Sequence, residues 1–335
     1  MRSYLLLLVF LLIGCSAVPE WHGQKASSYA PAEIHAAAAS LLEEERFEPS
    51  AELSEYLIRT SFGYEKLEEV LFLAGEARFH LQEYDEAFLH YRRLMAQYPY
   101  TARTVAVSKR IWVVGKELID RRGGWFGDLS SLHEVGVEAL NFLVTTFPRS
   151  SYADDAWKEL AEAFALDHHH QAVADIYERL IREYPESEWT DLATYKVTQA
   201  YRAQSRGFAY DVDPLLRAHA ALKRYLRAFP EGNFVEQAQA DLKELEEDVV
   251  RHELEIAQFY RERGLPEGER LHLANAATRF PDSLQAQEAS EVLEEQFEGP
   301  GEDSTDLLRP REDRPIWQRG AATGGDPGRD SGKNR

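Results

Sequence analysis

The stretch WKELAEAFALDHHHQAVADIYERLIREYP, residues 157–185, decides the fold class of this chain. Its apolar residues recur every three or four positions in two runs, and these residues are Trp157, Leu160, Ala161 and Phe164, then Val173, Tyr177 and Leu180. That spacing places side chains on one face of an α-helix. Pro185 ends the second run, because the residue before a proline is pushed out of helical geometry. The stretch therefore predicts two helices joined by a short turn.

The same arrangement recurs along the chain, where it is marked by an aromatic residue followed by proline. These pairs are Tyr98-Pro99, Phe147-Pro148, Tyr184-Pro185, Phe229-Pro230 and Phe280-Pro281. The residue twelve positions before each proline is small in most of the repeats. The five residues at this position are Ala87, Gly136, Val173, Ala218 and Glu269. A small side chain lets a neighbouring helix approach closely. The prolines are 49, 37, 45 and 51 residues apart, so the repeats are irregular and carry insertions.

These helix pairs resemble tetratricopeptide repeats, although the usual period of those repeats is shorter, about 34 residues. A two-helix unit of this kind cannot bury its own apolar face and must stack on its neighbours. We therefore expect an all-α fold, a tetratricopeptide-like right-handed helical solenoid over residues 31–297. No run in this part of the chain alternates convincingly between apolar and polar residues, as a strand would.

The N-terminus predicts a lipid anchor. Tyr4 to Ile13 is an apolar run, too short for a membrane span of roughly 20 residues but suited to a secretory signal. It ends in Leu12-Ile13-Gly14-Cys15, which resembles the bacterial lipobox, and Cys15 is the only cysteine in the chain. Lipidation at Cys15 implies a signal peptide over residues 1–14, followed by a tether over residues 15–30. The alternative is an ordinary signal peptide that is cleaved after Ala17.

Composition argues against several classes of function. Acidic residues outnumber basic ones by 58 to 38, and a net charge of −20 disfavours nucleic acid and anionic membrane surfaces. A single cysteine excludes a disulfide framework and a cysteine-based zinc site. His168–His170 fall at the expected turn between two helices, where we favour a solvated turn over a metal site. His252-Glu253 begins like a zinc-protease helix, but Ile256 stands where the second histidine is needed. We expect no enzyme, metal or cofactor.

Two loops interrupt the helical spacing, at residues 120–131 and 205–214. The first loop holds Trp125 and Phe126 among three glycines. Aromatic residues on such a loop are candidate anchors for a partner protein. They would equally fit a local cap over the adjacent helices, since large aromatic side chains are more often buried than exposed.

The C-terminal third carries a closer resemblance. The apolar spacing predicts one long helix from Phe234 to Arg263, about 45 Å long at about 1.5 Å per residue. Along this helix and directly after it stand four short motifs: Leu242-Lys243, His252-Glu253, Phe259-Tyr260 and Glu262-Arg263-Gly264. They resemble the late repeats of the BamD family, the tetratricopeptide lipoproteins of the outer-membrane β-barrel assembly machinery. The resemblance is good over residues 184–297. Earlier in the chain, only the general repeat pattern is similar.

The chain also departs from that family. Asp248 stands where family members commonly carry a basic residue, and Gly232 replaces the serine of a Tyr-Pro-x-Ser motif. An extra pair of helices is expected over residues 31–62. Residues 298–335 are rich in glycine, proline and charge, so we expect a disordered tail, in which Ile316-Trp317 could form a short binding motif.

The resemblance implies a non-enzymatic outer-membrane lipoprotein that faces the periplasm and supports assembly and insertion of β-barrel proteins. Its implied partners are a β-barrel assembly protein of the BamA type and unfolded outer membrane proteins. Arg251, His252 and Tyr260 of the long helix are candidate contacts, beside Trp125 and Phe126. A second hypothesis keeps the lipid anchor and the fold but gives the protein a different role, which is to coordinate peptidoglycan synthesis or cell constriction.

Overall fold

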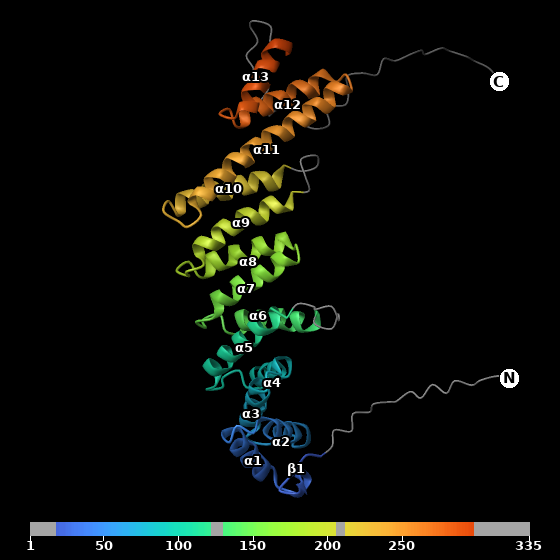
Figure 1. Ribbon diagram of the computed structural model, residues 1–335, viewed down its shortest axis with the longest axis vertical. Coiled ribbons are helices and arrows are strands. Elements are labelled where there is room, and N and C mark those ends of the chain that lie inside the picture. The colour runs from blue at the N-terminus through green and yellow to red at the C-terminus, as the bar shows by residue number, and fades with distance from the viewer. Residues whose placement is uncertain (1–17, 122–129, 206–211, 298–335) are drawn as a thin grey trace, which may run out of the picture. The chain divides into compact units, whose positions relative to one another are not determined.

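The structure is a computed structural model that describes residues 18–121, 130–205 and 212–297. Within these residues the chain forms thirteen α-helices, preceded by two very short strands and one 3-10 helix (Figure 1). The first elements are β1 (Glu20–Trp21), β2 (Gln24–Lys25), η1 (Ala26–Ser28), α1 (Pro31–Glu43), α2 (Phe47–Thr60), α3 (Leu67–His80), α4 (Tyr84–Gln97), α5 (Thr104–Ile119) and α6 (Ser130–Thr146). They are followed by α7 (Ala153–Leu166), α8 (His170–Glu183), α9 (Thr190–Gln204), α10 (Asp213–Ala228), α11 (Val235–Glu262), α12 (Pro266–Arg279) and α13 (Leu284–Phe297).

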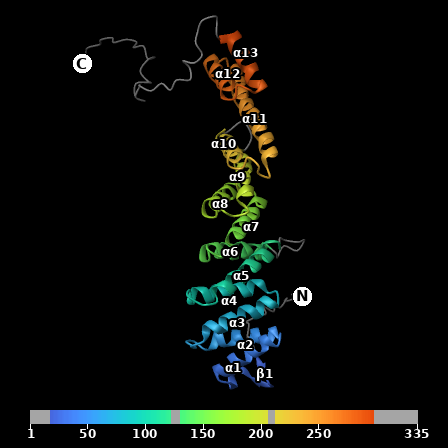
Figure 2. The same cartoon turned by 90° about the vertical axis from the view of Figure 1, so that its left-hand side faces the viewer.

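The contacts divide the chain into two compact units. Among the described residues, unit 1 comprises those up to Gln204 together with Arg217–Gln239, and unit 2 comprises Ser205, residues 212–216 and those from Ala240 onward. Within unit 1, consecutive helices from α1 to α9 pack on one another in chain order, as layers of a solenoid (Figures 1 and 2). One apolar core runs between these layers. The predicted all-α, tetratricopeptide-like solenoid is therefore confirmed.

Small residues set the close approach of these helices. Gly75 in α3 lies against the ring of Tyr91 in α4, and a Cβ at Gly75 would come within 2.6 Å of that ring. Gly136 in α6 lies against the backbone of α5, where a Cβ would stand 2.6 Å from the nitrogen of Ile119. Gly136 stands twelve residues before a proline, so at this position the small residue allows the close helix approach that the sequence predicts.

A hydrogen bond closes several helix pairs at their ends. The turn after α4 returns to the first turn of α3, where the Thr101 hydroxyl donates to Glu68 at 2.6 Å. The turn after α8 does the same with α7, where the Ser187 hydroxyl donates to Asp154 at 2.7 Å. Ser187 Oγ also accepts from the backbone N–H of Trp189 at 3.2 Å, which helps to start α9. The serine or threonine after the proline is therefore a latch within one helix pair.

Gly232 replaces this serine in the pair formed by α9 and α10. A Cβ at Gly232 would lie 2.6 Å from the hydroxyl oxygen of Tyr225, so the position has no room for a serine. The Tyr225 hydroxyl instead donates to Asp191 of α9 at 2.7 Å. The backbone and side-chain amides of Asn233 donate to the same carboxylate at 2.9 and 2.8 Å. The latch is kept with different donors.

Residues 18–30 differ from the expected tether. Trp21 and Gln24 pair across an antiparallel two-residue turn, in which His22 and Gly23 both have positive φ, at 50° and 73°. Such a turn matches the twist of paired strands. The indole of Trp21 packs against the core of unit 1, and Ala26 is fully buried. An apolar side chain within the segment therefore fixes it to the core of unit 1.

Several sequence expectations lie outside the described residues. They are the signal peptide over residues 1–14 with Cys15, the aromatic loop residues Trp125 and Phe126, and the tail over residues 298–335. The long helix of the C-terminal third lies within them, and α11 runs from Val235 to Glu262. Gly264 follows it with φ of 65°, a left-handed conformation that commonly ends a helix.

Candidate partner-binding surface

Unit 2 is held together by an apolar core that contains two buried carboxylates. The core lies between α11, α12 and α13, and its buried residues are Val250, Ala257, Leu273, Ala274, Ala276, Ala286, Ala289 and Leu293. Glu253 of α11 is buried and points at α12. His272 Nδ1 lies 2.8 Å from one oxygen of Glu253, and Arg279 Nη2 lies 3.5 Å from the other. A buried charge needs such partners, so Glu253 fixes the register of α11 against α12.

The second carboxylate, Glu269, fixes the other end of the same helix pair. It is buried at the start of α12 and accepts a hydrogen bond from Arg261 Nε of α11 at 2.5 Å. Between the two carboxylates, Tyr260 stacks on His272 with ring centroids 5.5 Å apart. Gly268 leaves room for that ring, since a Cβ there would come within 2.4 Å of it. Tyr260 therefore serves packing within unit 2 as well as being a candidate contact.

His252 lies inside unit 2, and its side chain offers a partner almost no surface. It is only 6% exposed, and its Nδ1 has no hydrogen-bond partner among the described residues. Burial lowers the pKa of His252, because the imidazolium loses its hydration there. His252 therefore offers little side-chain surface in this structure, and its direct contact with a partner stays a prediction.

Arg251 lies one residue earlier and is more accessible. Its side chain is 42% exposed, and Nη1 donates to Asp248 at 3.1 Å, one turn before it on α11. Asp248 itself is buried. The acidic residue that departs from the family pattern therefore anchors a neighbouring arginine at the surface of α11.

The exposed aromatic surface of unit 2 lies where α11 meets α12, and we call Phe259, Tyr260, Arg263 and Leu265 the α11–α12 corner. Phe259 is 47% exposed and Leu265 49% exposed. The Arg263 guanidinium lies 3.5 Å from the centroid of the Phe259 ring, close enough for a cation–π contact. Sequence reasoning singled out Tyr260 but not Arg263 or Leu265 as contacts. An apolar residue directly after a helix-ending glycine was the signal available for Leu265.

Comparison with known proteins identifies the family. A family model described as an outer membrane lipoprotein, YfiO, matches residues 132–306, more than half of the 335 residues. The chain belongs to the YfiO family. A tetratricopeptide repeat model also matches residues 69–99, which include most of α3 and all of α4.

Relatives of this YfiO-family protein are outer membrane protein assembly factors BamD. The factor from Pasteurella multocida (strain Pm70) is 22% identical over 176 residues, which cover 50% of this chain and 68% of the relative. The factor from Vibrio cholerae serotype O1 is 23% identical over 174 residues, covering 49% and 72%. The factor from Haemophilus influenzae is 24% identical over 177 residues, covering 49% and 68%.

The YfiO match begins in α6 and extends past α13, so it includes the whole α11–α12 corner. Two of the five expected contacts in this YfiO-family protein, Trp125 and Phe126, lie outside the described residues. Arg251 and Tyr260 lie on the same helix, α11, nine positions apart. The structure therefore puts these two in one unit and leaves them as proposed contacts.

Unit 1 of the YfiO-family protein exposes apolar residues at the turns between its helix pairs. Phe62 follows α2, and Tyr100 and Val105 lie at the junction of α4 and α5. Tyr100 is 99% exposed and Val105 is 80% exposed, so neither contributes to the core. Large apolar side chains that are this exposed mark surfaces able to bind other proteins when they gather.

The described residues of the YfiO-family protein hold no group of three or more side chains arranged to bind a metal ion. His168 has φ of 58° and lies, as expected, in the turn between α7 and α8. Among the described helices, none has the length and apolar content needed to cross a bilayer.

Proposed function

We propose that this protein is a lipid-anchored scaffold in the assembly and insertion of β-barrel outer membrane proteins, and that it acts by binding other proteins. The observation that carries the proposal is the YfiO match over residues 132–306, together with relatives named outer membrane protein assembly factor BamD. The anchor in this proposal is an acyl group on Cys15, and the described helices face the periplasm.

The α11–α12 corner is the proposed docking surface for a barrel-forming assembly protein of the BamA type. It combines an aromatic ring, a guanidinium and an aliphatic side chain, and aromatic residues and arginine are enriched among residues that dominate binding energy. The buried ion pairs of Glu253 and Glu269 hold the helices that present this corner. A rigid presentation lowers the entropy lost on binding.

The exposed apolar residues of unit 1 are the proposed contacts for unfolded outer membrane proteins. Such chains carry strands with unpaired edges and apolar faces, which aggregate unless they are bound. Phe62 and Tyr100 present large aromatic surfaces to an extended chain, each at a turn of the solenoid.

Site-directed photocrosslinking in membranes tests this assignment. A benzophenone amino acid at Phe259 should capture the barrel-forming assembly protein, whereas the same group at Glu255, exposed on α11 but outside the corner, should not. Capture of cell-wall synthases at Phe259 in place of the barrel-forming protein would contradict the proposal. It would support the rival role in peptidoglycan synthesis or constriction.

The lipid anchor is tested separately by mass spectrometry of the mature N-terminus. An acylated peptide that begins at Cys15 is expected, and a Cys15→Ala variant should leave the membrane fraction. A mature chain that begins after Ala17 and carries no acyl group would overturn the anchor and leave the binding assignment standing.

A further inference from the structure

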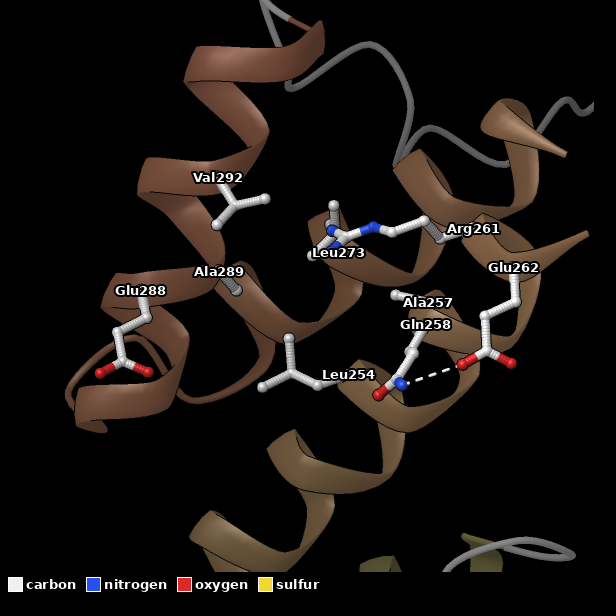
Figure 3. Close-up of a pocket in the computed structure, with 9 residues that line it drawn as sticks. All are labelled: Leu254, Ala257, Gln258, Arg261, Glu262, Leu273, Glu288, Ala289 and Val292. Atoms are coloured by element: carbon white, nitrogen blue, oxygen red, sulfur yellow. Dashed lines mark hydrogen bonds between the residues drawn. The ribbon is translucent and has the colours of Figure 1, made fainter. Parts of the chain in front are cut away.

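Unit 2 contains a hollow that none of the packing described above fills. It lies between α11, α12 and α13, and its volume is about 360 Å³ (Figure 3). The floor is apolar and formed by Leu254, Ala257, Leu273, Ala289 and Val292. Leu254 and Val292 are only partly buried, so the floor is open to solvent. A hollow of this size fits one or two large side chains, since small-molecule pockets begin at about 300 Å³.

The rim of the hollow is acidic. Glu262 on α11 and Glu288 on α13 stand on opposite sides of it (Figure 3). Glu288 has no hydrogen bond or ion pair among the described residues, and within them Glu262 accepts only from the neutral amide of Gln258, at 3.0 Å. The one rim guanidinium, Arg261, is already paired with the buried Glu269. An occupant with an apolar centre and positive charge on both sides would complement this site.

The chain itself carries such a segment after α13. In the stretch RPIWQR, residues 314–319, Ile316 and Trp317 are flanked by Arg314 and Arg319. Trp317 is the only aromatic residue in the sequence after Phe297. The segment thus has a large apolar centre, two positive charges and no negative charge. Its apolar centre suits the apolar floor, and its two arginines suit the acidic rim.

The connection is long enough for the segment to reach the hollow of its own molecule. Ala289 and Val292 line the hollow and precede Phe297, the last residue of α13, by eight and five residues. That is about 8–12 Å along the helix. Trp317 lies twenty positions after Phe297, a distance of up to about 66 Å when the chain is extended. The tether would also keep the segment at a high effective concentration, in the millimolar range for short linkers.

We propose that residues 314–319 dock in the hollow of the same chain, with Ile316 and Trp317 on the apolar floor and the two arginines against Glu262 and Glu288. The segment is then an intramolecular ligand of unit 2. It covers the α11–α13 groove until a partner with a similar apolar and basic segment displaces it. The proposal stands independently of which assembly the protein serves.

Competition with a peptide tests the docking on the full chain in detergent. A labelled peptide of residues 308–320 is titrated, with anisotropy as the readout, into wild-type protein and into a Trp317→Ala variant. The peptide should bind the variant at least about tenfold more tightly, because the variant no longer fills its own hollow. The same peptide with alanine for tryptophan should bind at least about 30-fold more weakly, as expected for a central aromatic anchor.

Charge reversal at the rim then locates the site. In the Trp317→Ala background, Glu288→Arg should weaken peptide binding about tenfold. The matched control is Glu291→Arg, which is exposed on the same helix and does not line the hollow. Equal binding to wild type and Trp317→Ala, or equal loss in the two charge reversals, would overturn the proposal. So would a wild-type protein that self-associates through this segment in sedimentation, because the occupant would then be a second copy.

Discussion

The hydroxyl of Tyr91 is predicted to stabilise unit 1 measurably, because it joins three successive helices. Tyr91 of α4 is fully buried, and its hydroxyl donates to Glu76 of α3 at 2.6 Å. The same carboxylate accepts from Arg110 of α5 at 2.9 Å from Nε and 2.7 Å from Nη2. Burial first, and then repulsion from Glu76, raise the pKa of Tyr91 well above its usual range, so the phenol remains a donor.

The size of the effect follows from what each substitution leaves behind. Tyr91→Phe removes one hydrogen bond to a charged acceptor but leaves no cavity, and Glu76 keeps Arg110, so the cost should be about 1.5 kcal/mol. Glu76→Ala leaves a buried hydroxyl and a partly buried guanidinium without their carboxylate, so the cost should be about 3–5 kcal/mol. The double variant should cost about 1–2 kcal/mol less than the sum, because the orphaned hydroxyl is then absent.

Urea unfolding followed by circular dichroism measures these differences in the free energy of unfolding. The slope of that free energy against urea concentration should be the same for all variants. The matched control is Tyr56→Phe, since the Tyr56 hydroxyl makes no hydrogen bond within the described part of the chain. Its effect should stay within about 0.5 kcal/mol. The reasoning fails if Tyr91→Phe is as mild as this control, or if the Tyr91 and Glu76 substitutions add without coupling.

Two other perturbations test the helix packing and its charges. Gly136→Ala should destabilise the protein by about 1–2 kcal/mol in the same urea experiment, because the new methyl group would clash with the backbone of Ile119. An unchanged unfolding midpoint would contradict that close approach. Burial raises the pKa of Glu55, but hydrogen bonds from His90 and Arg78 outweigh it and hold the pKa at about 2, below the ordinary 4.5. Glu55 therefore contributes about 3 kcal/mol above pH 5 that is lost as the pH falls towards 2, and Glu55→Gln should flatten this part of the stability–pH curve; an equally steep curve would refute it.

The helix pairs could be predicted from sequence because their signals are local. The proline after each aromatic residue ends a helix, and the three- and four-residue spacing of Val173, Tyr177 and Leu180 defines its buried face. The same local spacing predicted the long helix within one residue at each end, since Phe234 precedes α11 and Arg263 follows it. Helical periodicity carries this information without any knowledge of the partners in space.

The latches and the surface residues could not be predicted in the same way. The bond from Thr101 to Glu68 joins residues 33 positions apart, and no local pattern distinguishes Glu68 from the other acidic residues of the chain. The helical pattern of α11 does not show which of its polar residues are buried, and the burial of His252 depends on packing against residues far away in the sequence. The fold of residues 18–30 also depends on a distant surface, because Trp21 needs the core of unit 1 to pack against.

The latches have a mechanical consequence. Each ties the end of a helix pair to the beginning of the same pair, as Ser187 does with Asp154, so its strength does not depend on the next pair. The pair of α5 and α6 differs, because α5 has no acidic residue in its first turn to receive such a bond. Under a stretching force, unit 1 should therefore lengthen in discrete steps, one helix pair at a time, and the pair of α5 and α6 should open without the loss of a latch.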